Sequence, residues 1–165
     1  PMSSILKVSE IQDPTNGNTA FTVNTAGYVA RAKNAAFLAH TPSNATYNQD
    51  NVLGWDTEVF DTDSCFVPST GLYTAPVNGI YCFNACILIG AGDAFGVGLY
   101  YKNNSTLVAF QAWSEGSANK GSSVASITIE MNANDTMGIY WYGSSYGPAY
   151  EGSYSHFSGH LLAAT

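Results

Sequence analysis

The sequence predicts an all-β protein that folds as a sandwich or jelly roll. Only 10% of the residues are charged and 13% are aromatic, whereas about 25% charged residues is usual for a globular domain. Gly, Ser, Asn and Thr fill much of the rest, which suits strands joined by polar turns. Several short strand patterns follow one another at regular spacing. No stretch has apolar residues at helical spacing between helix caps.

The first 34 residues form a separate unit of short strands and tight turns. A dense turn signal at residues 13–18 separates Ile11 from the next strand pattern at residues 21–23. This unit is too small to hold a core alone, so we expect it to pack on the next domain or on copies of itself. Pro1 before Met2 is interpreted as a tag remnant. The expected organisation is therefore an extension, 1–34, and a head, 35–165.

The segment 80–89 is apolar on both faces, which a half-solvated strand would not be. One face meets the sandwich core and the other meets a second dry surface. Asn84 interrupts the second face. The core side carries Tyr81, Phe83, Ala85 and Ile87, and the opposite side carries Ile80, Cys82, Cys86 and Leu88.

Two further strand patterns follow along the chain. Residues 123–130 alternate, with Ala125, Ile127 and Ile129 on one face and polar residues or Val124 on the other. Residues 137–142 are a further aromatic strand. Each pattern matches the period of two that places alternate side chains on opposite faces of a sheet.

The charge balance excludes some partners. The net charge is −7 with five Lys and Arg, and an acidic chain repels phosphates, so no nucleic-acid partner is expected. No apolar run reaches the roughly 20 residues that span a bilayer, and the start has no signal-peptide pattern. Two explanations of the low charge stay open. Much of the surface lies between subunits, or the exterior is rich in Tyr, Ser and Asn.

An ordered series of short motifs resembles the globular heads of C1q and tumour-necrosis-factor-like proteins. The resemblance covers roughly residues 36–165. The motifs, in chain order, are Ala36-Phe37-Leu38-Ala39, Trp55-Asp56, Thr70-Gly71-Leu72-Tyr73, Pro76-Val77-Asn78-Gly79-Ile80-Tyr81-Cys82-Phe83, Gly98-Leu99-Tyr100-Tyr101-Lys102-Asn103-Asn104, Asn134-Asp135-Thr136-Met137 and Phe157-Ser158-Gly159-His160-Leu161-Leu162.

The resemblance implies a ten-stranded jelly-roll sandwich that forms homotrimers and binds partners rather than catalysing a reaction. It places Ile80, Cys82, Cys86 and Leu88 near the three-fold axis. The expected core residues are Phe37, Tyr73, Tyr81, Phe83, Phe157 and Leu161. The chain has Asn134 where such heads usually carry Gly, and Asn tolerates the same left-handed backbone. It also departs from the family pattern at Phe66-Val67.

The opening of the chain resembles tail-fibre and appendage proteins of marine bacteriophages. The pattern is Leu6-Lys7-Val8, then Ile11-Gln12-Asp13, then a Gly-Asn turn. This resemblance implies a virion protein made in the host cytoplasm, with other virion proteins as partners.

Metal ligands are sparse. Cys82 and Cys86 are too far apart along one strand for an easy disulfide, so they are expected to be reduced apolar residues. His156 and His160 lie about 13 Å apart on a strand at ~3.3 Å per residue, so one protomer cannot close a site with them. Three copies of one histidine around an axis are the alternative. His40 is expected to be a strand histidine.

An acidic segment includes Asp56, Glu58, Asp61 and Asp63. Oxygen ligands in a flexible loop suit Ca²⁺, and Asp61 and Asp63 are the candidates, against a solvated acidic edge. The segment lacks the glycine and the distal glutamate of an EF-hand loop. No other cofactor is expected.

No enzymatic site is expected. The sequence has no Ser-His-Asp set with a strained nucleophile turn, and nothing places two carboxylates for glycoside hydrolysis. The glycine-rich residues 90–98 lack the strand–helix unit and the lysine of a phosphate loop.

The segment 140–154 combines Tyr, Ser and Gly, a composition that supplies rigid aromatic contacts and adaptable hydrogen bonds in binding loops. The ligand candidates are Trp113, Tyr146, Tyr150 and Tyr154, and the ligand would be a host-surface glycan or protein. The alternative is a core strand followed by an inert loop.

The predicted function is a non-enzymatic trimeric structural and adhesion protein of a bacteriophage virion, in a tail fibre or a capsid appendage. The alternatives are a secreted C1q/TNF-like recognition protein and a glycan-degrading enzyme.

Overall fold

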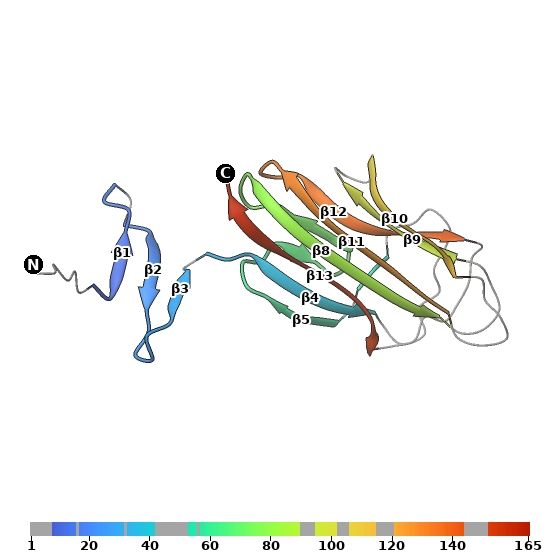
Figure 1. Ribbon diagram of the computed structural model, residues 1–165, viewed down its shortest axis with the longest axis horizontal. Helices are drawn as coiled ribbons and strands as arrows, with labels where there is room; N and C mark the ends of the chain where they lie inside the picture. Colours follow the sequence, from blue (N-terminus) through green and yellow to red (C-terminus); the bar gives the residue numbers. More distant parts are fainter. Residues whose placement is uncertain are drawn as a thin grey trace, which may run out of the picture. The chain divides into compact units, whose positions relative to one another are not determined.

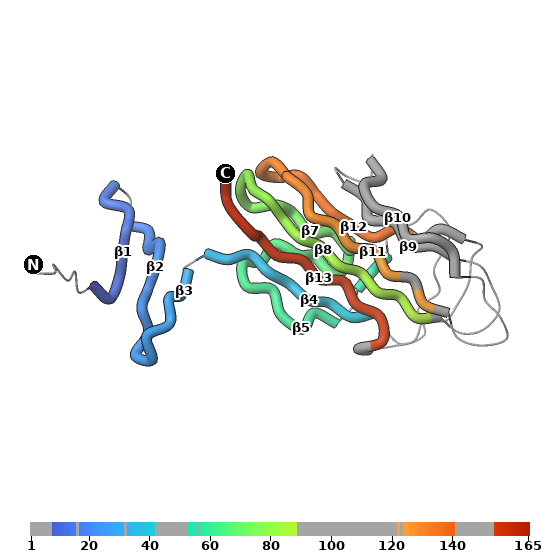
Figure 2. The backbone as a smooth tube through the Cα atoms, in the orientation of Figure 1, coloured from blue at the N-terminus to red at the C-terminus, as the bar shows by residue number. Residues whose placement is uncertain are grey.

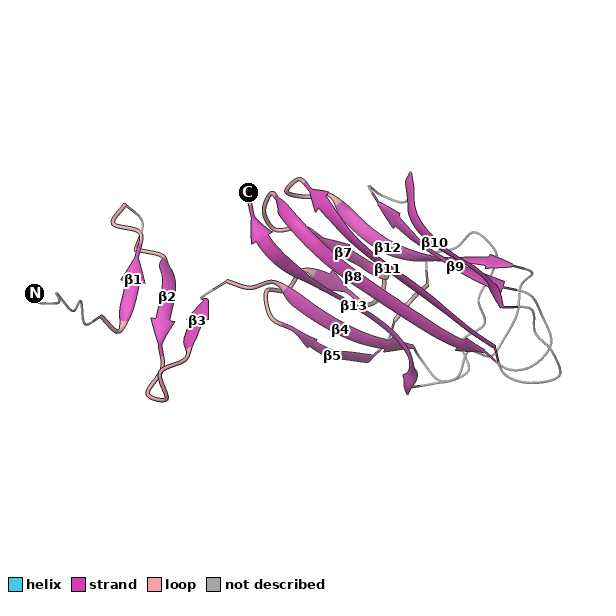
Figure 3. Ribbon diagram, in the orientation of Figure 1, coloured by secondary structure: helices cyan, strands magenta, loops and turns pink. Residues whose placement is uncertain are grey.

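The computed structural model of the chain describes residues 8–15, 17–31, 33–41, 53–55, 57–89, 95–101, 106–114, 121–143 and 152–165. Every described element is a strand, and Figure 3 shows no helix among them. No described segment is a helix long and apolar enough to cross a membrane. The chain divides into two compact units, Pro1–Asn34 and Ala35–Thr165.

The first unit is a three-stranded antiparallel sheet in the order β1-β2-β3 (Figure 1). The strands are β1 (Glu10–Gln12), β2 (Thr19–Val23) and β3 (Val29–Arg31). Gly17 and Gly27 have φ of 70° and 84°, and they lie in the two turns that reverse the chain. Glycine adopts this left-handed backbone without steric cost, so these positions allow tight turns.

The second unit is a sandwich of two five-stranded sheets. One sheet has the order β11-β8-β13-β4-β5, and the other has the order β10-β9-β12-β7-β6. Their strands are β4 (Ala36–Thr41), β5 (Thr57–Asp61), β6 (Phe66–Val67), β7 (Leu72–Thr74), β8 (Gly79–Ile89), β9 (Phe95–Tyr101), β10 (Thr106–Ser114), β11 (Gly121–Met131), β12 (Thr136–Gly143) and β13 (Gly152–Ala164).

The last strand occupies the centre of the first sheet. Figure 2 shows β13 in red between β8 and β4, which come from much earlier in the chain. Phe157 of β13 pairs with Ala85 of β8 on one side and with Ala39 of β4 on the other. The most C-terminal strand therefore joins the two halves of this sheet, β11-β8 and β4-β5.

Aromatic rings fill the space between the sheets. Phe37 of β4 stacks on Phe66 of β6 with ring centroids 4.5 Å apart, so this contact joins the two sheets. Tyr73 of β7 meets Phe83 of β8 edge-on at 5.3 Å. Such ring pairs add to the hydrophobic effect of burying the side chains.

The expected core residues lie at or beside this aromatic cluster. Leu161 is half-buried and packs against it. The others are buried: Phe37, Tyr73, Tyr81, Phe83 and Phe157.

The turn at Asn134 takes the conformation that the sequence predicts. Its φ is 71°, in the left-handed region, and its N–H donates to the Ala75 carbonyl at 2.8 Å. The Asp135 carboxylate accepts from the Asn132 N–H at 2.9 Å, which closes the turn on itself. Asn therefore replaces the more common glycine without loss of the turn.

Candidate functional site

The outer face of the sheet β11-β8-β13-β4-β5 is the candidate site, and β8 shows how the chain builds it. Alternate side chains of β8 point into the sandwich, where Tyr81, Phe83 and Ile87 are each 0% exposed. The side chains between them point outward. Ile80 is 38% exposed and Cys82, Cys86 and Leu88 are half-buried.

The strand register sets which outward residues are neighbours. Cys86 pairs with Val124 of β11 on one side and with His156 of β13 on the other. His156 also pairs with His40 of β4. The described residues contain no group of three His, Cys, Asp or Glu arranged to hold a metal ion. Within one chain, the neighbours Val124, Cys86, His156 and His40 therefore form a surface patch that is partly apolar and partly polar.

Asn84 occupies the middle of the outer face. It pairs with Ser126 on β11 and with Ser158 on β13. The Ser126 hydroxyl donates to the Asn84 side-chain carbonyl at 2.8 Å. A polar group at this position has a partner within the same chain, so covering it with another subunit would leave that hydrogen bond in place.

Charge is nearly absent from four of the five strands of this sheet, and the fifth, the edge strand β5, carries Glu58 and Asp61. Strands β4, β8, β11 and β13 together contain one charged residue, Glu130, which is exposed near the end of β11. Three large apolar side chains on these strands are exposed to solvent: Ile80 at 38%, Val124 at 47% and Leu162 at 45%. Depletion of charge with exposed apolar residues is typical of the centre of a protein–protein interface.

All three cysteines are free: Cys65 is buried, and Cys82 and Cys86 are half-buried. Burial raises the pKa of the Cys86 thiol above its ordinary value, because a thiolate loses solvation there. The neutral thiol is a weakly polar group of small volume. It suits a packed surface better than a reactive site.

In the acidic segment, Asp61 accepts hydrogen bonds from the backbone of its own loop. The Asp61 carboxylate accepts from the Phe66 N–H at 2.7 Å and from the Asp63 N–H at 3.3 Å. Ser64 between them has φ of 54°, and the carboxylate holds this left-handed turn in place. Asp56 lies outside the described residues. A Ca²⁺ site at Asp61 and Asp63 stays a prediction.

Of the ligand candidates, the structure describes one side chain. Tyr154 is 62% exposed near the start of β13. Tyr146 and Tyr150 lie outside the described residues, as does the side chain of Trp113 in β10. The aromatic contact segment therefore stays a prediction, with Tyr154 as its exposed member.

The sequence analysis missed Ser155, a residue that orders the edge of the candidate face. Its side chain is 0% exposed, and its hydroxyl oxygen accepts from the Leu88 N–H at 3.0 Å. The register of β13 against β4 shifts between Gly152 and His156, and the serine bonds to β8 within that irregular stretch. The available signal was a polar residue two positions before Phe157, on the core side of the strand.

Fold and site together define a C1q/TNF-like jelly-roll head, a class of domain that typically occurs in trimeric recognition proteins rather than in enzymes. The chain belongs to the C1q domain family, whose pattern matches residues 36–162. Comparison with curated proteins gives no significant match.

Solved structures share the fold at low sequence identity. The globular domain of zebrafish complement 1qA protein has a TM-score of 0.65 and 13% identity, and the match covers 79% of this chain and 99% of that chain. Eiger TNF from S. frugiperda has a TM-score of 0.63 and 14% identity, with 80% and 93% covered. Murine APRIL at pH 8.5 has a TM-score of 0.57 and 9% identity, with 79% and 100% covered. These matches establish the fold alone.

Proposed function

We propose that the chain is a homotrimeric binding protein whose heads meet through the outer face of the sheet β11-β8-β13-β4-β5. The observation that carries this proposal is the near absence of charge from four adjacent strands. A free surface of that kind would expose Ile80, Val124 and Leu162 to water, and burial of apolar area stabilises association by roughly 25 cal/mol per Å².

The polar residues of the face support the same arrangement. The Ser126 hydroxyl donates to the Asn84 side-chain carbonyl, and the Asn84 amide nitrogen donates to Cys82 Sγ at 3.9 Å, so these hydrogen bonds stay in place when the face is covered. The thiols of Cys82 and Cys86 add small, weakly polar contacts. Light scattering tests the proposal, since a trimer has about three times the 17.5 kDa mass of the chain. A monomer at micromolar concentration would contradict it.

The particle that carries this trimer is proposed to be a bacteriophage virion, with the chain in a tail fibre or a capsid appendage. Support comes from the opening residues 6–18, which resemble phage appendage proteins, and from the small β unit that precedes the head. The role is structural and adhesive, with a host-surface glycan or protein as ligand. Labelled antibody should decorate intact particles, and unlabelled particles would remove the virion role while leaving the trimer intact.

A secreted recognition protein is the second candidate, and one observation favours it. The matched structures include the globular domain of zebrafish complement 1qA protein and Eiger TNF from S. frugiperda, both animal proteins. The genes beside the coding sequence separate the two candidates. Tail and capsid genes support the virion role, and their absence favours secretion.

A further inference from the structure

The N-terminal sheet has no core of its own. Among the described residues of this unit, only Thr19 is as much as half-buried, and the rest are exposed. Two hydrogen-bonded strand pairs and two tight turns nevertheless define the sheet. A unit of three short strands that buries almost none of its side chains has little stability in water, so we expect it to need a partner surface.

One face of this sheet is polar. The Thr19 hydroxyl and the Gln12 amide both donate to the Glu10 carboxylate. The hydrogen bonds from Thr19 and Gln12 lower the pKa of Glu10, because they favour the charged carboxylate. This face is suited to water.

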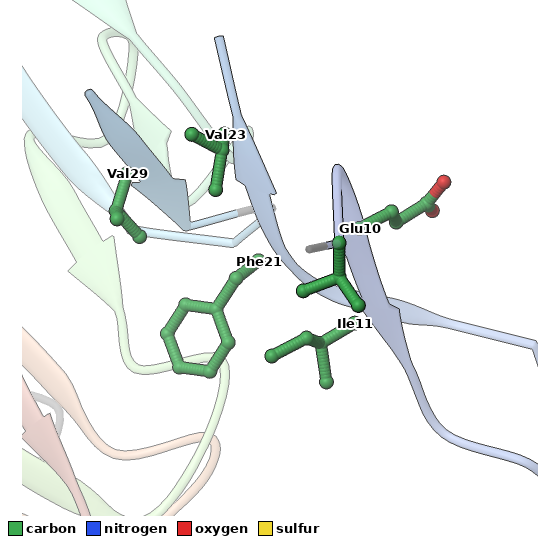
Figure 4. Close-up of a pocket in the computed structure, with 6 residues that line it drawn as sticks. Glu10, Ile11, Phe21, Val23 and Val29 are labelled. Atoms are coloured by element: carbon green, nitrogen blue, oxygen red, sulfur yellow. The ribbon is translucent and has the colours of Figure 1, made fainter. Parts of the chain in front are cut away.

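The opposite face is an apolar hollow of about 240 Å³. Ile11 pairs directly with Phe21, and Val23 pairs with Val29, so these apolar side chains lie side by side. Phe21 also pairs with Arg31 of β3, so one cationic side chain shares this face. In Figure 4 the four apolar side chains line one hollow, while the carboxylate of Glu10 points away from it. The full lining is Val8, Glu10, Ile11, Phe21, Val23 and Val29.

The small size of this hollow restricts what can cover it. A stable contact between independent proteins buries about 1,200–2,000 Å² in total, and six residues on three short strands cannot supply that area. The cover must therefore be held nearby by a second contact, which the proposed head trimer supplies. Residues 32–35 join the unit to β4 and span at most ~14 Å when extended, so any partner bound to the head stays within reach at high effective concentration.

Copies of the same unit offer a matched surface. Residues 1–34 carry Lys7, Arg31 and Lys33 against Glu10 and Asp13, a net charge of 3 − 2 = +1. The rest of the chain then has −7 − 1 = −8. The strong negative charge is therefore confined to the head, and copies of the extension repel one another only weakly.

We propose that the N-terminal extensions of three chains join their apolar faces, with Phe21 at the centre. This would be a second trimer contact, N-terminal to the one between the heads. This inference rests on the proposed head trimer, which brings the three extensions together. The occupant of the hollow is thus the same face of the neighbouring chains.

Photo-cross-linking of the full chain tests this contact. Phe21 is replaced by benzoyl-phenylalanine, which keeps an aromatic ring in the hollow, and unlabelled chains are mixed with ¹⁵N-labelled chains before assembly. Light–heavy cross-links between residues 8–31 of two chains are expected in the trimer fraction. Cross-links to head residues, or none in a confirmed trimer, would overturn the inference. A monomer by light scattering would instead defeat the head trimer itself.

Amide hydrogen exchange of the full chain gives an independent readout. In the unsubstituted trimer the amides of β1–β3 should exchange slowly. Phe21→Ser should speed their exchange at least tenfold and leave the head amides unchanged. The matched control is Tyr28→Ser, since Tyr28 is 73% exposed and does not line the hollow. Unprotected β1–β3 amides in the unsubstituted trimer, or equal effects of the two variants, would overturn the inference.

Discussion

Gly159 of β13 lies directly between Phe83 and Phe37 in the middle of the sheet β11-β8-β13-β4-β5. It pairs with Phe83 on β8 and with Phe37 on β4. A β-carbon at this position would lie 2.6 Å from Phe83 Cε1 and 2.9 Å from Phe37 Cε1. The missing side chain of Gly159 therefore provides the space that two core rings occupy.

Gly159→Ala should lower the free energy of unfolding by about 1–3 kcal/mol, because an added methyl group forces both rings from their positions. Chemical denaturation followed by fluorescence measures this change. Gly54→Ala is the matched control, since no atom lies within 4 Å of a β-carbon there. Equal stability of the two variants would show that the rings adjust freely.

Two buried tyrosines should respond in opposite ways to loss of the hydroxyl group. The Tyr73 hydroxyl is buried and has no hydrogen-bond partner among the described residues, whereas the Tyr81 hydroxyl donates to the Val77 carbonyl at 2.7 Å. Tyr73→Phe should therefore be neutral or stabilising. Tyr81→Phe should lose about 0.5–1.5 kcal/mol, the net contribution of one hydrogen bond. Thermal melts of the two variants measure these changes in stability. A larger loss of stability for Tyr73→Phe than for Tyr81→Phe would contradict the assigned hydrogen bonding of the two hydroxyl groups.

Ser155→Ala should destabilise the head by about 1–3 kcal/mol, because the Leu88 N–H loses the hydrogen bond that it donates to the buried serine hydroxyl. The same denaturation assay measures the loss. Ser69→Ala, in an exposed turn, should leave stability unchanged. A neutral Ser155→Ala variant would mean that water or the backbone replaces the hydroxyl.

Leu88→Asp should dissociate or unfold the proposed trimer. Three copies of a carboxylate would meet at an apolar contact, and an unpaired buried charge is strongly destabilising. Light scattering and circular dichroism together separate dissociation from unfolding. Val67→Asp is the control, because Val67 is 46% exposed on the other sheet. A stable Leu88→Asp trimer would place the contact elsewhere.

Tyr154 lies near the start of β13, at the end of the proposed trimer face, and its side chain is 62% exposed in the single chain. Tyr154→Ala should reduce attachment to host cells while leaving the trimer mass and the melting temperature nearly unchanged. Three linked sites gain avidity from weak single contacts, so the loss is best measured by cell binding of the whole trimer. Reduced binding together with a lowered melting temperature would assign Tyr154 a structural role instead.

Alternation along single strands was predictable from the sequence, because it depends only on which side chains share a face. The assignment of Tyr81 and Phe83 to one side of β8 and Cys82 to the other needs no knowledge of neighbouring strands. The left-handed turn at Asn134 was predictable from the resemblance, because Asn stands there where such heads usually carry Gly and tolerates the same backbone.

Relationships between distant strands were not predictable in this way. From the sequence, Gly159 only weakens a strand pattern. Its role is evident once the register places Phe83 and Phe37 on either side of it. Ser155 bonds to Leu88, 67 positions away, across an irregular stretch of β13. The Tyr73 hydroxyl has no hydrogen-bond partner among the described residues, a feature that depends on the packing of both sheets. Such features arise only when the register between strands is known.

The central position of β13 also determines when the head can assemble during synthesis. Strands β4 and β5 lie on one side of it and β8 and β11 on the other, although all four are translated earlier. Until β13 leaves the ribosome, these two pairs have no strand to join them, and the facing edges of β4 and β8 stay open. Unpaired edges of nascent sheets are prone to aggregate. Production of the protein should therefore depend on chaperones that shield these edges until translation of the last strand is complete.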